Sequence, residues 1–377
     1  MLSPHPDRSA DGDDHDDHDD AGGPETAVTL GGQVEVLHGT ALSLGYFICS
    51  AQLEPCVGEA NTAAAPEEGA ARRMDSAAYL LREPVEGRRD GKDRVENDSR
   101  AKAQRFAELH REGCFLLPNA WDVGSARILE AAGFPAVATT SAGVAFSLGR
   151  PDHDFFAEQP PEDRVDRDTM LGRVREIAGG IAVPLSADLE DGYGESPETV
   201  ATTVSRTLAA GAAGGNIEDF TGDRTRPLYG PELSVDRVRA AHETLAAGGE
   251  PFVLVGRTDV LLVGGTLDEA VRRANAYLEA GADCAFVPGA ADAETIGTLV
   301  RELDGPLNVV MGLTGNALSL DDLRALGVRR VTVGGSIARA MYRHLLDAAR
   351  ELADLGTFSY AAEQLSQTEL NDLFRRG

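Results

Sequence analysis

The sequence predicts a (β/α)8 barrel, and three observations support this fold. Eight short apolar segments typical of strands recur between positions 114 and 334. Amphipathic segments typical of helices separate most of them, and several of those end in Gly, the usual residue after a helix. The alternation occupies about 250 residues, the normal size of such a barrel. A doubly wound sheet is the alternative, but it requires neither eight strands nor so regular an alternation.

The elements follow one another in a fixed order. The predicted strands are residues 114–120, 134–140, 183–189, 214–219, 252–258, 284–289, 306–311 and 329–334. The predicted helices are residues 101–113, 123–133, 196–211, 234–248, 266–281, 292–303, 319–327 and 336–356. Each helical segment carries apolar residues at helical spacing, so each has one face for covering a strand.

Composition divides the chain in two. Residues 1–99 are rich in acidic and small residues, including the run DGDDHDDHDD, and are predicted to be a largely disordered acidic extension. Residues 100–377 are predicted to hold the barrel, with C-terminal helices after the last strand. Order is therefore expected to begin near position 100.

The charge balance excludes several classes of function. The chain has 62 acidic and 35 basic residues, a net charge of -27, which would repel nucleic acid and anionic membranes. No apolar run reaches the roughly 18 residues that cross a bilayer, so we expect a cytoplasmic protein. The only lysines are Lys92 and Lys102, which excludes Schiff-base aldolases and P-loop nucleotide hydrolases for the barrel.

Polar residues follow several predicted strands, at the barrel face where active sites form. Asp188 and Glu190 follow the third strand, Glu218 the fourth and Arg257 the fifth. An oxygen-only ligand set favours a hard cation, Mg²⁺ or Mn²⁺. The alternative is that these are solvated loop acids. Arg257 is suited to a substrate carboxylate or to a structural ion pair with one of the acids.

Asn119 ends the first predicted strand, and Thr140 with Ser141 ends the second. These polar side chains belong to the same predicted rim as the acids.

Four segments in order carry a resemblance to a known family. They are LPNAWDVGSARILEAAGFPAVATTSAGVAFSLGRPD, ADLEDGYG, GAAGGNIED and VGRTD. Over roughly residues 102–356 the chain resembles the isocitrate lyase/phosphoenolpyruvate mutase superfamily, close to 2-methylisocitrate lyase and carboxyvinyl-carboxyphosphonate phosphorylmutase. The resemblance implies a (β/α)8 barrel that binds Mg²⁺ and a small 2-keto or 2-hydroxy acid. It also implies a homo-oligomer, commonly a tetramer, in which the last helix packs on a neighbour.

The resemblance also implies roles for particular residues. Asp188, Glu190 and Glu218 would hold the metal, largely through its waters. The carboxylate of the substrate would be bound at Thr140, Ser141 and Ala142, with Arg257 contributing. Asp152 would handle protons, and Arg257 would be a second catalytic residue.

Departures from the family pattern bear on the reaction. The loop after the fourth strand, residues 220–227, lacks the K-[KR]-C-G-H segment of isocitrate lyases and the Lys-Thr-Asn gate of mutases. Glu190 stands where the family motif has Asp. We expect a Mg²⁺-dependent lyase that cleaves a C–C bond through an enolate. Mutase or hydrolase chemistry at a C–P bond is one alternative, and a non-catalytic carboxylate-binding barrel is the other.

Overall fold

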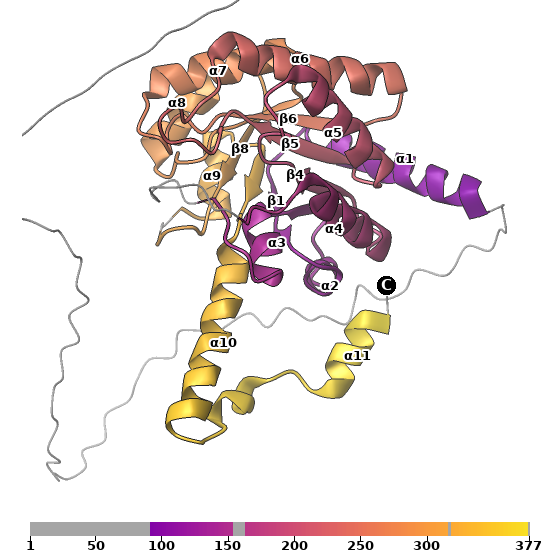
Figure 1. Ribbon diagram of the computed structural model, residues 1–377, viewed down its shortest axis with the longest axis vertical. Helices are drawn as coiled ribbons and strands as arrows, with labels where there is room; N and C mark the ends of the chain where they lie inside the picture. The colour runs from indigo at the N-terminus through magenta and orange to yellow at the C-terminus, as the bar shows by residue number, and fades with distance from the viewer. Residues whose placement is uncertain (1–90, 154–162, 316–317, 376–377) are drawn as a thin grey trace, which may run out of the picture. The chain divides into compact units, whose positions relative to one another are not determined.

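The computed structural model describes residues 91–153, 163–315 and 318–375 (Figure 1). The predicted extension lies outside the described residues up to position 90. The first helix, α1 (Gly91–Leu109), begins inside the segment assigned to that extension, earlier than the sequence predicts.

The strands form one closed parallel barrel, which confirms the predicted fold. All strand pairs are parallel, and the order runs β1-β9-β8-β7-β6-β5-β4-β3-β2. The strands are β1 (Phe115–Leu117), β2 (Asn119–Ala120), β3 (Val137–Thr139), β4 (Leu185–Asp188), β5 (Gly214–Glu218), β6 (Val253–Arg257), β7 (Cys284–Phe286), β8 (Leu307–Val310) and β9 (Arg330–Thr332). Each lies within one of the eight predicted segments.

Two of these strands are a single predicted one. β1 pairs with β9 and β2 pairs with β3, and Pro118 separates them. Proline has no N–H to donate, so the regular ladder is interrupted there. The Pro118 carbonyl still accepts a hydrogen bond from the Ala138 N–H at 2.9 Å. β1 and β2 therefore act as the first of eight barrel strands.

Most helices lie around the barrel, and the long helix after the last strand projects away from it (Figure 1). The helices after α1 are α2 (Val123–Ala131), α3 (Ser141–Ser147), α4 (Arg167–Gly180), α5 (Pro197–Ala209), α6 (Pro231–Gly248), α7 (Leu267–Glu279), α8 (Ala293–Glu302), α9 (Leu320–Leu326), α10 (Ser336–Asp354) and α11 (Gln367–Arg375). The sequence predicted all of these except α3, α4 and α11. Polar caps begin several of them: the Ser196, Thr266 and Asp292 side chains each accept a backbone N–H of the first turn.

Successive side chains of each strand point alternately toward the surrounding helices and toward the barrel interior. On β4, Leu185 and Ala187 belong to the apolar layer between strands and helices, together with Val174 of α4 and Val204 of α5. The intervening Ser186 and Asp188 therefore point to the barrel interior.

Helix α1 covers the end of the barrel where the strands begin. Its Phe106 is fully buried with Phe115 and Leu117. A Cβ at Gly214 would lie 2.7 Å from the Phe106 ring, so only glycine fits at that point of β5. With this end filled, the opposite end is left for a site. Among the described residues, no helix combines the length and apolarity that a membrane crossing requires.

Candidate active site

The strand ends bring the predicted residues to one rim. Asp188 of β4 lies in register beside Asn216 of β5, and Glu218 of β5 lies beside Arg257 of β6. Because parallel strands end at the same edge, the acids on neighbouring strands are held together by the barrel itself.

Asp188 is held by uncharged donors. Its Oδ2 accepts the Ser141 N–H at 2.9 Å, and its Oδ1 accepts the Asn216 side-chain amide at 2.9 Å. Its own N–H donates to the Thr139 hydroxyl at 2.8 Å. No described residue forms an ion pair with Asp188, and both side-chain hydrogen bonds that it accepts come from neutral donors.

Glu190 lies on a tight turn and is almost fully buried. Its φ is 49°, a left-handed conformation that costs energy for a residue with a Cβ. Its Oε2 is 2.8 Å from the Arg164 Nε and 3.3 Å from the His153 Nε2. Its Oε1 accepts the Tyr193 hydroxyl at 3.1 Å. Both carboxylate oxygens therefore already have partners.

Glu218 and Arg257 form a buried chain of charges with Asp259. The Arg257 Nη1 is 2.8 Å from the Glu218 Oε2, and its Nε is 2.8 Å from the Asp259 Oδ1. Burial raises the pKa of Glu218 well above its usual range, and the charges of Asp259 and Asp188 add to the rise against the effect of Arg257. Several carboxylates thus crowd around one guanidinium.

Asp152 faces the same acids. Burial raises the pKa of Asp152 to about 7, and the negative charges of Glu190 and Asp188 add to this rise. A carboxyl that titrates near neutrality is suited to giving and taking protons.

The three residues after β3 lie beside Asp188. Thr140 is buried and precedes α3, and its hydroxyl makes no capping hydrogen bond to that helix. The Ser141 N–H is already given to Asp188, so in this arrangement it orients that carboxylate. Ala142 approaches the start of α10, where a Cβ on Gly335 would lie 3.1 Å from the Ala142 Cβ.

Some polar residues at strand ends belong to the scaffold. The Asn119 side chain donates to the Thr139 carbonyl at 2.6 Å and accepts the N–H groups of Val333 and Gly334, which closes the barrel between first and last strands. Asp219 accepts the Tyr277 hydroxyl at 2.7 Å and the Thr258 hydroxyl at 2.8 Å. Asn119 is therefore occupied by packing contacts rather than available to a ligand.

Two residues of the site were not predicted. Asn216 precedes Glu218 by two positions on β5, so the two side chains lie on the same face of the strand. The sequence could therefore have predicted that Asn216 belongs to the site. Arg164 precedes α4, in a segment with no strand or helix pattern to position it. Nothing in the local sequence indicated that it reaches Glu190.

The acidic side chains of the rim could bind a metal ion through its waters rather than directly. Within residues 91–153, 163–315 and 318–375, no three acidic, His or Cys side chains converge closely enough to ligate one ion directly. Asp188, Glu190 and Glu218 nevertheless form a carboxylate-rich rim, and the crowding raises the pKa of Glu218. Such a set fits a hydrated Mg²⁺ held mainly through its waters, the form that Mg²⁺ prefers in proteins.

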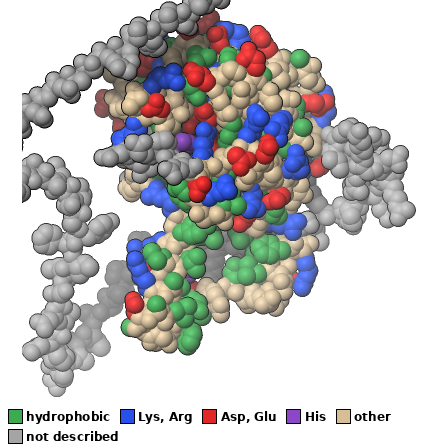
Figure 2. All heavy atoms as spheres, in the orientation of Figure 1, with side chains coloured by type: hydrophobic (Ala, Val, Ile, Leu, Met, Phe, Trp, Pro, Cys, Tyr) green, Lys and Arg blue, Asp and Glu red, His purple; other side chains and the backbone are tan. Residues whose placement is uncertain are grey.

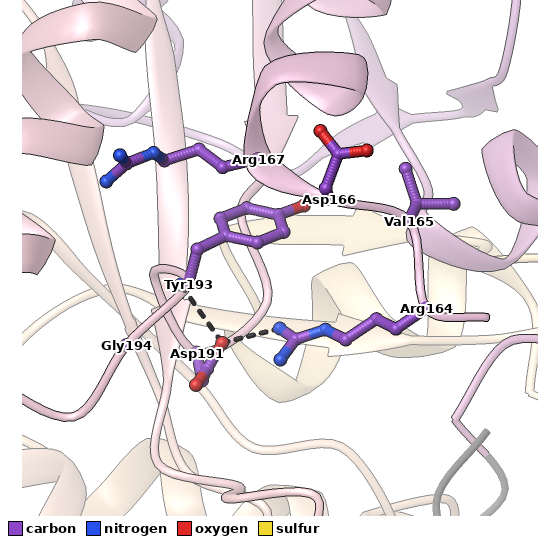
Figure 3. A pocket seen from close by; sticks show the side chains of 7 residues that line it. All are labelled: Arg164, Val165, Asp166, Arg167, Asp191, Tyr193 and Gly194. Atoms are coloured by element: carbon purple, nitrogen blue, oxygen red, sulfur yellow. Dashed lines mark hydrogen bonds and ion pairs between the residues drawn. The ribbon is translucent and has the colours of Figure 1, made fainter. Parts of the chain in front are cut away.

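A pocket lies beside this rim (Figure 3). Its volume is about 380 Å³, and it is lined by Arg164, Val165, Asp166, Arg167, Asp191, Tyr193 and Gly194. Figure 3 shows the Arg164 side chain extending toward Asp191, which also accepts the backbone N–H of Tyr193 at 3.0 Å. Arg164 and Tyr193 also contact Glu190, so the pocket adjoins the predicted metal site.

The chain is similar to a known protein family and to several of its members. The family model of phosphoenolpyruvate phosphomutase matches residues 106–353. An uncharacterised protein of Mycobacterium tuberculosis H37Rv is 34% identical over 253 residues, which cover 66% of this chain and 89% of that protein. The 2-methylisocitrate lyase of Escherichia coli K12 is 31% identical over 257 residues, 65% of this chain and 83% of the lyase.

A solved structure is also similar. A Burkholderia cenocepacia J2315 protein, provisionally described as a lyase/mutase, is 43% identical with a TM-score of 0.69. The match covers 74% of this chain and 97% of that protein.

Proposed function

The chain belongs to the phosphoenolpyruvate phosphomutase family, an enzyme family of lyases and phosphomutases, and we propose that it is a Mg²⁺-dependent lyase. The substrate would be a small 2-keto or 2-hydroxy carboxylic acid, and a C–C bond would break to leave an enolate. One observation carries this proposal: Asp188, Glu190 and Glu218 share a rim with Arg257 and with Asp152, whose pKa is raised to about 7.

Asp188, Glu190 and Glu218 would hold the metal, with Mn²⁺ as a substitute for Mg²⁺. When bound, the ion would supply Lewis-acid polarisation of substrate oxygens. Asp188 is the strongest candidate among the three, because its partners are the neutral Ser141 N–H and Asn216 amide.

Arg257 would bind the substrate carboxylate or stabilise charge that develops on the enolate oxygen. Its guanidinium is held between Glu218 and Asp259, so it stays in one position without reorganising during the reaction. The Thr140 hydroxyl and the Ala142 N–H would complete the carboxylate site.

Asp152 would deliver or remove the proton. Its raised pKa supports this role, because a group that titrates near the working pH can act in either direction. The loop of residues 220–227 contains no Cys, Lys or His, so it offers no side chain of the types that the resembled lyases use there.

Chemistry at a C–P bond is the second candidate, and it rests on the match to the phosphomutase model. Both reactions pass through a pyruvate enolate, so the rim described above is compatible with either. The two candidates differ in the substrate that the enzyme accepts.

Pyruvate release, coupled to an NADH-consuming dehydrogenase, tests the proposal. The panel is oxaloacetate, 2-methylisocitrate, 2,3-dimethylmalate and phosphonopyruvate, each with and without Mg²⁺. Turnover of a C–C substrate that requires both Mg²⁺ and Glu190, and is lost in Glu190→Ala, supports the lyase. Pyruvate release from phosphonopyruvate alone would replace it by hydrolysis of a C–P bond.

A further inference from the structure

Arg164 forms the shortest ion pair of Glu190 among the described residues. Its Nε is 2.8 Å from the Glu190 Oε2, and its Nη2 pairs with the Asp191 Oδ1 at 2.5 Å. The guanidinium also lies 5.1 Å from the centre of the Tyr193 ring. One arginine thus bridges two consecutive carboxylates of the turn after β4.

These charges are largely removed from water. The exposed fractions of the side chains are 4% for Glu190, 7% for Asp191 and 29% for Arg164. A buried carboxylate requires a nearby positive charge or several donors, because burial penalises the ionised form. Arg164 meets this requirement for both acids without a metal.

The same contacts oppose a metal ion. The two oxygens of Glu190 are already occupied by Arg164, His153 and Tyr193. A divalent cation placed beside Glu190, directly or through water, would lie within a few ångströms of the guanidinium charge. Two cations at that separation in a buried site repel each other strongly.

Arg164 has space into which it can move. It lines the pocket of about 380 Å³ together with Asp191 and Tyr193 (Figure 3). A guanidinium that leaves Glu190 can therefore move into this pocket while it stays close to Asp191.

We propose that Arg164 is a built-in counter-ion of Glu190 which a divalent metal must displace, so that metal binding and release of Arg164 from Glu190 are linked. Arg164 then sets the metal affinity of the site. This inference rests on the proposed role of Glu190 in binding the metal.

Calorimetric titration of the full chain with MgCl₂ tests the proposal directly. Arg164→Gln removes the charge and keeps a hydrogen-bond donor, so the Kd for Mg²⁺ should fall about tenfold. Arg164→Lys keeps the charge, and its Kd should remain within about twofold of the wild type. Arg226→Gln is the matched control, because Arg226 pairs with Glu195 in an exposed contact at 3.5 Å, and it should leave the Kd unchanged.

A second measurement uses the unmutated protein. Phenylglyoxal modifies accessible guanidinium groups, and peptide mass spectrometry reports the rate at Arg164 and at Arg226. Mg²⁺ should speed the modification of Arg164 and leave that of Arg226 unchanged. This readout remains valid if Arg164→Gln does not fold.

The outcomes separate this inference from the proposed function. If the wild type binds Mg²⁺ and Asp188→Asn abolishes binding, the metal site stands. An unchanged or weaker affinity in Arg164→Gln, or slower modification of Arg164 with Mg²⁺, would then overturn the inference alone. If neither the wild type nor Arg164→Gln binds Mg²⁺ or Mn²⁺, both the metal site and the inference fail.

Discussion

Single charges in this barrel take their properties from burial and from their nearest neighbours. Asp188, Glu190 and Glu218 are three similar acids within one rim, yet their partners differ. Asp188 has neutral donors, Glu190 has Arg164, and Glu218 has Arg257. Acids that share one rim therefore have different partners, and we propose that they contribute differently to metal binding.

Asp152 is expected to control the pH dependence of turnover. Its pKa is raised to about 7 by burial and by Glu190 and Asp188, so as a base it becomes active as the pH rises through that value. Asp152→Asn should lower kcat by roughly 10²-fold or more and remove this limb of the profile. The measurement is kcat between pH 5.5 and 8.5, and a limb near pH 7 that persists in the variant would contradict the role.

His110 is expected to make the fold less stable in mild acid. Its Nδ1 contacts the Phe106 carbonyl at 2.8 Å, and its Nε2 is buried without a partner. Burial lowers the pKa of His110 from 6.5 to about 4, and the charge of Arg330 adds to the lowering. The unfolded chain takes up the proton first, so stability is lost as the pH falls from 6.5 to about 4, by up to roughly 3 kcal/mol.

Urea unfolding at pH 7, 5.5 and 4.5 measures this effect. His110→Asn should flatten the change in unfolding free energy over that range. His344→Asn, at an exposed position of α10, is the control and should keep the wild-type slope. Equal slopes in all three proteins would exclude His110 as the cause.

Neighbouring strands of the barrel are joined by side-chain hydrogen bonds as well as by the backbone hydrogen bonds of the sheet. Asn119 forms the join where Pro118 interrupts the first strand, and it bonds both to β3 and to the residues after β9. A barrel has no free edge only if first and last strands stay together.

Asn119→Ala should therefore destabilise the fold by about 3 kcal/mol, because it leaves buried backbone groups unsatisfied. Asn275→Ala removes two bonds at the surface, to the Glu302 carbonyl and the Asp304 N–H, whereas Asn119→Ala removes three. The surface variant should cost under about 1 kcal/mol. Urea midpoints of the two variants give the comparison, and equal losses would contradict a special role of the join.

At the scale of the whole molecule, α10 carries apolar side chains that no described residue covers. The exposed fractions on α10 include 56% for Met341, 62% for Leu345 and 43% for Leu352, and Leu355 directly after the helix is 72% exposed. Green side chains on the projecting lower part of the molecule are visible in Figure 2. An exposed apolar face of this size is typical of an interaction surface.

We propose that the chain forms a homo-oligomer through this face, a tetramer if it follows the resembled family. The double variant Leu345→Asp and Leu352→Asp should reduce the mass measured by light scattering. Arg343→Asp, on the polar side of α10 where it pairs with Asp347, should leave the mass unchanged. A wild-type protein that is monomeric at micromolar concentration would overturn the proposal.

Periodicity predicted the barrel strands and most of the helices around them. The eight strands and the helices from 196 to 356 are recognisable because burial of one face imposes a period of two or 3.6 residues on the sequence. The rim was predictable for the same reason: strand ends in a parallel barrel face one way, so Asp188, Glu218 and Arg257 could be placed without coordinates. The sequence did not predict α3 and α4. Helix α3 is short and α4 is weakly amphipathic, so neither segment shows a clear helical period.

The partner of each charged group could not be predicted from the sequence, because it depends on how the chain folds. Arg164 meets Glu190 from a segment 26 positions away that has no regular pattern, and Asn119 turned out to close the barrel rather than to bind a ligand. These contacts depend on distances of a few ångströms between groups remote in sequence. Periodicity constrains which face a side chain takes, but the energy of a buried charge depends on which atoms lie against it, and only the folded chain brings those atoms together.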